Sequence, residues 1–321
     1  MMTTTNQNVI DPVPVELIEM ELTPDRLLRD TNKGGNKIYI IDAFSAPNVM
    51  REVGRLREIA FRAAGGGTGK DCDIDEFDTM EPPCRQLVVW DPEAREIIGG
   101  YRFIPGNEIK MRPDGMPRIA TSHMFSFSER FLKDYLPHTI ELGRSFVRLE
   151  YQTTRVGVKA LYALDDLWDG LGALTVIYPD MRYLFGKVTM YPSYNADCRN
   201  MILYFLTKHF PDPDRLVWPM TPLTTHMDNE AMRKLFIHDT FKDDYKILNK
   251  AIRDHGYNIP PLVNAYMSLS PSMRMFGTAI NDEFGNVEES GIFFVIDEIF
   301  EEKKGRHIGT FIPINPSPED K

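Results

Sequence analysis

Apolar residues recur at helical spacing in one segment near the start of the chain. Within residues 48–64, the positions that fall on one side of a 3.6-residue helix are Val49, Val53, Leu56, Ala60 and Phe61. Ser45 precedes this segment as a candidate N-cap, and Pro47 suits a first helical turn. Three glycines, Gly65–Gly67, follow it directly. The pattern predicts an amphipathic helix that stops at Gly65.

Shorter runs rich in β-branched and aromatic residues alternate with further helical patterns. Arg85–Trp90 and Glu96–Ile104 flank an Asp91-Pro92 turn and predict an antiparallel hairpin. The other expected strands are 37–42, 139–151, 183–189, 275–280 and 291–297. The other expected helices are 125–136, 158–174, 195–209, 229–236 and 242–255. Strands that alternate with helices, together with a hairpin, predict an α/β (α+β) fold with a mixed central sheet flanked by helices.

The distribution of polar residues suggests where the folded domain begins. Residues 1–36 are polar and hold several prolines and a Gly-Gly pair, so we expect an extended N-terminal arm. Residues 37–321 then form a single domain. Within it, residues 210–260 are rich in helix and turn signals and are interpreted as a helical insertion in the C-terminal half.

Composition and charge narrow the class of protein. The net charge of −10 opposes nucleic-acid binding, which needs a basic surface, although residues 281–321 carry −6 of it. Three widely spaced cysteines fit neither a disulfide framework nor a CxxC site, which favours a cytoplasmic protein. No signal peptide or membrane-spanning run is visible, so a pore-forming role is disfavoured, while peripheral membrane contact stays open.

Two local motifs have functional and structural interpretations. The run Gly65–Lys70 resembles a phosphate loop only superficially, because its spacing is wrong and it follows a helix; a flexible loop is the simpler interpretation. The acidic run Asp71–Asp78 is dense enough to suggest calcium, but its sixth and twelfth positions are Glu76 and Pro82 rather than Gly and Glu. Recognition of a cationic amine and a solvated loop are the remaining alternatives for it, and no metal site is expected.

Three arginines stand among apolar residues, where an unpaired charge is costly. Arg57, Arg102 and Arg144 are each flanked by such residues, so each needs a partner. The acidic run before the hairpin is a candidate source of partners. Glu141 lies three residues before Arg144 near the end of a predicted strand, and a structural ion pair between them is the alternative to a catalytic role.

The order of these motifs resembles a known family. The motifs are Arg57-x-x-x-Phe61-Arg62, Asp75-x-Phe77-Asp78, Gly99-Gly-Tyr-Arg102 and Glu141-Leu-Gly-Arg144-Ser-Phe146. Together they resemble the acyl-homoserine-lactone synthases and their relatives, which have the GNAT acyltransferase fold. Further segments are similar to the hemolysin-like amino-acid N-acyltransferases of the ornithine-lipid type: Leu167–Gly170, Tyr183–Gly186, Pro260–Tyr266 and Phe284–Gly285. The resemblance spans about residues 50 to 300.

This resemblance implies an N-acyltransferase of aminolipid synthesis. A (3-hydroxy)acyl group would pass from the phosphopantetheine thioester of acyl carrier protein to the α-amine of glycine or ornithine, without a bound cofactor. Glu141 would accept the ammonium proton, and backbone N–H groups beside a splayed strand would hold the oxyanion. The catalytic residues expected on this basis are Glu141, Arg144 and Arg102. The residues expected to bind substrate are Arg57, Phe61, Asp75, Asp78 and Phe146.

The acyl donor is judged from a loop and a group of basic residues. The segment Gln152–Ala160 only partly matches the pyrophosphate loop of GNAT enzymes, which favours carrier protein over coenzyme A, although acyl-CoA stays possible. The basic residues expected to contact an acidic carrier protein are Arg155, Lys159, Arg182 and Lys187, with Arg199 and Lys208 nearby. The alternative is that these residues form only a solvated face.

Four other functions compete with this hypothesis. One is an acetyl-CoA-dependent GNAT, and another is a homoserine-lactone synthase that uses S-adenosylmethionine. A third places Cys198 as a nucleophile, but no histidine lies within ten residues of it on either side. The last is a non-catalytic or hemolysin-type lytic protein. The amino-acid acceptor and the acyl chain length cannot be read from the sequence.

Overall fold

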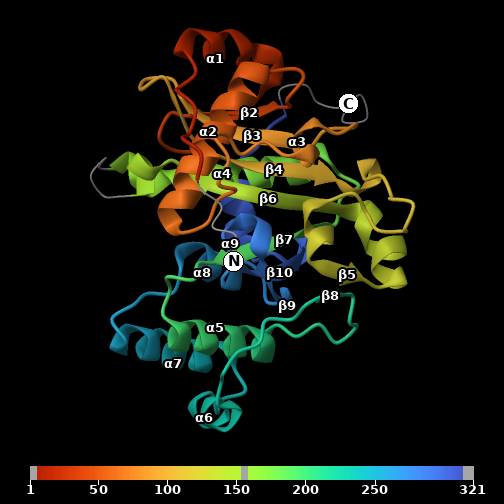
Figure 1. The fold of residues 1–321 in the computed structure, drawn as a ribbon, viewed down its shortest axis with the longest axis vertical. Helices are drawn as coiled ribbons and strands as arrows, with labels where there is room; N and C mark the ends of the chain where they lie inside the picture. Colours follow the sequence, from red (N-terminus) through yellow and green to blue (C-terminus); the bar gives the residue numbers. More distant parts are fainter. Residues whose placement is uncertain (1–5, 153–157, 314–321) are drawn as a thin grey trace.

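The computed structural model describes residues 6–152 and 158–313, with residues 158–161 described by backbone alone. Its centre is an eight-stranded mixed sheet in the order β1-β2-β3-β4-β6-β7-β10-β9 (Figure 1). Neighbouring strands of this sheet are antiparallel except for β6 and β7, which are parallel. The strands are β1 (Leu27–Asp30), β2 (Lys37–Ile41), β3 (Arg85–Asp91), β4 (Glu96–Pro105), β6 (Thr139–Val147), β7 (Tyr183–Met190), β9 (Arg274–Asn281) and β10 (Val287–Val295). The predicted mixed sheet and the β3–β4 hairpin are confirmed.

Helices cover both faces of the sheet, as its alternating side chains require. In β3, Leu87 and Val89 pack into one hydrophobic cluster with α4, while Val88 and Trp90 pack into another with α2. The helices are α1 (Val15–Glu21), α2 (Pro47–Ala64), α3 (Glu76–Thr79), α4 (Val158–Ile177), α5 (Ala196–His209), α6 (Asn229–Leu235), α7 (Phe241–Asp254), α8 (Pro261–Met267) and α9 (Glu301–His307). We call the side of the sheet covered by α2 the α2 face, and the side covered by α4 the α4 face.

The C-terminal half adds a layer of helices and a small second sheet. Helices α5 and α7 pack together at one end of the molecule, with α6 beyond them (Figure 1). Strand β5 (Phe125–Phe127) pairs with β8 (Val217–Pro219) in a two-stranded sheet. Residues 210–260 thus contain α6 and α7, in agreement with a helical insertion, and also the strand β8. No helix among the described residues is long and apolar enough to cross a membrane.

Several local expectations were wrong. Ser45 does not cap α2: Ala46 holds that position, and the Ser45 hydroxyl donates to Asp42 instead. The helix expected at 125–136 is strand β5 followed by a short helical stretch that begins at Phe131, because β5 finds a partner 90 residues further along the chain.

The N-terminal arm also differs from an extended segment. Residues 6–36 include α1 and strand β1, which pairs with β2 at the edge of the main sheet. A boundary at residue 36 would therefore separate two paired strands. The division into an arm and one domain stays a prediction.

Candidate active site

The local geometry of the site begins with an irregularity in β6. The pairing of β4 with β6 passes from Gly100–Phe146 to Arg102–Gly143, so Arg144 and Ser145 together oppose the single residue Tyr101. This is a β-bulge, which redirects side chains and interrupts the regular ladder. Arg144 has φ of 49°, a left-handed conformation that non-glycine residues seldom adopt.

Next to the bulge, the parallel strands β6 and β7 separate. Their pairing ends at Leu142 and Gly186. At Gly186 a Cβ atom would lie 2.7 Å from the Leu142 carbonyl oxygen, so glycine allows the close approach at this last pair. Beyond it the side of β6 that faces β7 has no strand partner. Backbone groups of residues 143–145 therefore border a gap in the sheet.

A cavity of about 750 Å³ occupies this gap and reaches both faces of the sheet. On the α2 face it is lined by charged and aromatic side chains, which are Phe61, Arg102, Glu141, Arg144, Lys187, Phe284 and Glu289. On the α4 face its walls are mostly apolar, with Trp168, Leu171, Leu184, Leu269, Ile292 and Phe294. The cavity thus joins a charged end to an apolar end through the splayed strands.

The arginines of the α2 face are held by the acidic run that precedes β3. Arg102 Nη1 lies 2.6 Å from Asp75 Oδ1 and 3.4 Å from Asp78 Oδ2. Arg144 Nε lies 2.9 Å from Asp73 Oδ2, and its guanidinium stacks 4.4 Å from the centre of the Phe284 ring. These contacts stabilise the left-handed backbone at Arg144.

Asp75 and Asp78 also have structural roles of their own. Asp75 caps α3, and Asp78 completes the capping box by accepting from the Asp75 backbone N–H. Burial alone would raise the pKa of Asp75, but Arg102 and Arg144 hold it well below its usual range. The hypothesis that the acidic run partners the arginines is confirmed. Neither aspartate lines the cavity, so neither of them would directly contact an amine bound there.

Glu141 is the buried carboxylate of the charged end. Its side chain comes from β6, and the residue is 2% exposed. Burial raises its pKa, while Arg102, Lys187 and contacts from Thr121 oppose that rise. Among the described residues no cation lies within ion-pair distance of it, unlike the other acids of this region. A carboxylate in this setting suits proton transfer.

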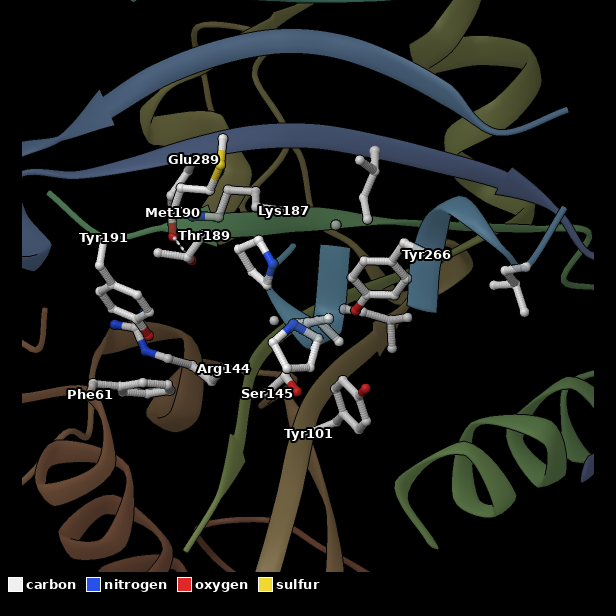
Figure 2. A pocket seen from close by; sticks show the side chains of 18 of the residues that line it. Phe61, Tyr101, Arg144, Ser145, Lys187, Thr189, Met190, Tyr191, Tyr266 and Glu289 are labelled. Atoms are coloured by element: carbon white, nitrogen blue, oxygen red, sulfur yellow. Dashed lines mark hydrogen bonds and ion pairs between the residues drawn. The ribbon is translucent and has the colours of Figure 1, made fainter. Parts of the chain in front are cut away.

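Lys187 and Glu289 form a second buried ion pair beside Glu141. The Lys187 Nζ lies 2.7 Å from Glu289 Oε2, and both side chains are less than a tenth exposed. Thr189 and Asn281 each donate a further hydrogen bond to Glu289. Burial would raise the pKa of Glu289, but Lys187 keeps it below its usual range. Figure 2 shows Lys187, Thr189 and Glu289 together on one side of the cavity.

The apolar end contains a few hydroxyl groups. Tyr101, Ser145 and Tyr266 line this part of the cavity (Figure 2). Burial raises the pKa of both tyrosines, so their hydroxyls are neutral. The Tyr101 hydroxyl is buried and makes no hydrogen bond within the described residues.

The structure brings together most of the residues expected from the sequence. Arg102, Glu141, Arg144 and Phe61 line the cavity, and the buried Arg57 lies behind them against Asp78. Phe146 does not line it, since this residue packs into the α2-side hydrophobic cluster. The individual roles of these residues stay predictions.

The basic docking surface expected around residues 155–208 is not formed as proposed. Lys187 is not on the surface at all, because its side chain lies in the cavity and pairs with Glu289. Arg199 is paired with Glu288, and Lys208 with Asp244. Arg182 is exposed. Arg155, and the side chain of Lys159, lie outside the described residues.

Two other sequence candidates are placed by the structure. Cys198 is fully buried in α5, burial raises its pKa, and it does not line the cavity, which disfavours a nucleophilic role. The Gly65–Lys70 loop folds over the buried Glu58, whose carboxylate accepts from the backbone N–H groups of Thr68 and Gly69. Within the described part of the chain, no cluster of three or more metal-ligating side chains occurs.

Sequence reasoning missed several residues of the cavity. Glu289 was not considered, and Thr189 was only the end of an expected strand. Tyr101, Ser145 and Tyr266 lie within motifs that carry the family resemblance, but no role was assigned to them. For Glu289 the signal was a glutamate just before a β-like tail segment, and it pairs with a lysine at a diagonal position of another strand. That pairing is visible only once β7 and β10 are known to be neighbours.

Comparison with known proteins agrees with this architecture. The acetyltransferase (GNAT) domain family matches residues 56–161. A glycine N(alpha)-acyltransferase of Bacteroides thetaiotaomicron is 65% identical over 310 residues, which cover 97% of this chain and 92% of that protein. A glycine N(alpha)-acyltransferase of Phocaeicola vulgatus is 61% identical over 310 residues, which cover 97% of this chain and 95% of that protein.

More distant likeness is found among solved structures. The acyl-homoserine-lactone synthase LasI has 12% sequence identity and a TM-score of 0.42, with 88% of this chain and 100% of that chain covered. The CoA-dependent synthase BjaI, solved with SAM and isopentyl-CoA, has 12% identity and a TM-score of 0.36, with 88% and 93% covered.

The fold, the split sheet and the domain match define the class: the protein is an acyltransferase of the GNAT type that transfers to an amine. Its similarity to the two curated proteins is high over nearly the whole length of each chain. The chain therefore belongs to the glycine N(alpha)-acyltransferase family.

Proposed function

We propose that the protein transfers a (3-hydroxy)acyl group from the thioester of acyl carrier protein to the α-amine of glycine. The observation that carries this proposal is the cavity through the sheet, which joins a charged end to an apolar end. A zwitterionic amino acid suits the charged end, and an acyl chain suits the apolar end. The names of the two relatives that are 61–65% identical favour glycine over ornithine.

The reaction can be followed atom by atom. The α-ammonium of glycine gives one proton to Glu141, which frees a lone pair on nitrogen. That nitrogen forms a bond to the thioester carbonyl carbon, and the electrons of the C=O bond move to oxygen. When the tetrahedral intermediate collapses, the C–S bond breaks and the second amine proton ends on the departing thiolate.

The oxyanion needs hydrogen-bond donors at the point where the strands separate. Beyond Leu142, the side of β6 that faces β7 has no strand partner, so backbone N–H groups of residues 143–145 are candidate donors. Gly143 has nothing within 4 Å of where a Cβ would lie, which leaves room for the reacting group. No covalent acyl-enzyme is needed in this scheme.

The donor, the product and the location complete the proposal. An N-acyl glycine is an aminolipid precursor, so the enzyme would act in lipid biosynthesis in the cytoplasm, with peripheral membrane contact during product release. Carrier protein is the proposed donor, and acyl-CoA is the alternative. The hemolysin-like label describes the resemblance and is not proposed as an activity.

An assay with defined donors and acceptors tests the proposal. The purified chain is incubated with 3-hydroxyacyl carrier protein or the matching 3-hydroxyacyl-CoA, and with glycine, ornithine or S-adenosylmethionine. Mass spectrometry is expected to detect N-acyl glycine formed with one free thiol per product, faster from carrier protein. Preference for acyl-CoA would reassign the donor, and lactone formation would contradict the proposed reaction.

A further inference from the structure

Lys187 stands between two carboxylates at the charged end of the cavity. Its Nζ is paired with Glu289 at 2.7 Å, and its charge also lowers the pKa of Glu141. Lys187 extends from β7 on the same face of the sheet as Glu141, two residues beyond the position paired with it. Both side chains line the cavity.

The charges around the cavity leave one acid without a basic partner. Arg102 and Arg144 are committed to aspartates of the acidic run, and Lys187 is committed to Glu289. Glu141 has no cation within ion-pair distance among the described residues. The site therefore offers one unpaired carboxylate to a substrate ammonium, and a second carboxylate whose cation is supplied by the protein itself.

We propose that Lys187 restricts the enzyme to acceptors that carry a single ammonium group. This inference rests on the proposed function. If the α-amine of a diamino acid such as ornithine lies at Glu141, its side-chain ammonium extends toward the Lys187–Glu289 pair. Lys187 repels that second charge and occupies the space that it needs. Glycine has neither a second ammonium nor a side chain.

Removal of the lysine should expose a site for the second ammonium. Glu289 would keep its hydrogen bonds from Thr189 and Asn281 but would lose its cation. A buried carboxylate without a counter-charge favours binding of a cation from outside. The proposal thus requires a gain of activity toward a diamino acid, which a merely structural role of Lys187 does not predict.

The test compares glycine and ornithine as acceptors for the wild type and for Lys187→Ala. We expect the ratio of kcat/KM for ornithine over glycine to rise by about 100-fold in the variant. Where Lys187→Ala has lost activity with glycine, added ethylammonium should partly restore that activity by replacing the missing charge. The double variant Lys187→Ala/Glu289→Gln should lose both effects. An unchanged ratio in Lys187→Ala would overturn the proposal, whether or not ethylammonium has an effect.

Two measurements keep this test separate from the proposed function. A wild type that does not acylate glycine contradicts the proposed function. Thermal unfolding then still tests Lys187, because ornithine should stabilise Lys187→Ala and not the wild type. If alanine prevents folding, Lys187→Ser, which offers Glu289 a hydroxyl, takes its place with the same expected change in the ratio. A ratio unchanged in that variant counts equally against the proposal.

Discussion

At the scale of single residues, Glu141 differs from every other acid that lines the cavity or supports its arginines. Asp73, Asp75, Asp78 and Glu289 each have a basic partner within 4 Å, whereas Glu141 has none among the described residues. Burial raises its pKa, and the nearby cations only moderate that effect. The buried carboxylate is thus suited to accept a proton from a substrate amine.

Replacement of this carboxylate tests its role as the base. Glu141→Gln is expected to lower kcat by about 10²- to 10⁴-fold, because the amide cannot accept the ammonium proton. Steady-state kinetics with glycine measure the loss, and thermal unfolding checks that the fold is retained. Since burial raises the pKa of Glu141, the wild-type rate should increase with pH through a value above that of an ordinary glutamate. The same pH dependence in Glu141→Gln would assign the base elsewhere.

At the scale of elements, close approach of helix α4 to α9 depends on glycine. Gly172 lies in α4, and a Cβ there would stand 2.4 Å from the carbonyl oxygen of His307 at the end of α9. Gly305, within α9 itself, has nothing within 4 Å of the same position. The two glycines therefore differ in packing although both are helical.

This difference gives a matched pair of variants. Gly172→Ala is expected to lower the free energy of unfolding by about 1–3 kcal/mol, because an extra methyl group must push the helices apart. Gly305→Ala should leave it unchanged or raise it by up to about 1 kcal/mol, because alanine favours the helix. Urea denaturation measures both. Equal effects of the two substitutions would show that the α4–α9 contact does not limit stability.

At the scale of the whole molecule, three distant parts of the chain meet at α4. Asp166 accepts a hydrogen bond from Asn36, which lies just before β2. Asp169 accepts from Asn32 and from His307 of α9. Burial raises the pKa of Asp166 to about 7. The N-terminal segment, the central helix and the C-terminal helix are thus joined through buried carboxyl groups.

The raised pKa makes stability depend on pH. The folded state binds the Asp166 proton more tightly than the unfolded state, in which the pKa is about 3.9. The stabilisation of the folded state by this tighter proton binding is therefore complete at pH values below about 4, and it is lost as the pH rises to 7. The asparagine of Asp166→Asn does not titrate. The free energy of unfolding of this variant relative to the wild type should therefore increase by about 2 kcal/mol between pH 5.5 and pH 8. Urea denaturation at both values measures this change.

A neighbouring residue provides the control. Asp165 is the partly exposed residue next to Asp166 and pairs with Arg306. Asp165→Asn, measured at the same two pH values, controls for the loss of a carboxylate from this helix that is not fully buried. If Asp166→Asn has the same stability relative to wild type at pH 5.5 and pH 8, the buried proton is not what couples pH to folding.

The sequence by itself determined most of the long elements and the pairing of the buried arginines with the acidic run. Period-2 and period-3.6 patterns record which side of a segment is buried, so the β3–β4 hairpin, α2 and the mixed sheet could be predicted. Arginines at buried positions require acids, and the acidic run before β3 was correctly expected to supply them. These inferences need only neighbours along the chain and the cost of burying a charge.

Only the tertiary structure decided which side chains share the cavity. Side chains of β7 pack into hydrophobic clusters on both faces of the sheet, so alternation along this strand does not show whether Lys187 meets water. The lysine was assigned to the surface, although it pairs with Glu289 of the neighbouring strand β10. The bulge at Arg144 and the separation of β6 from β7 arise from pairing between strands about 40 residues apart. Strand β5 likewise depends on β8, far along the chain. Such contacts are set by which strands become neighbours, and local periodicity carries no record of that choice.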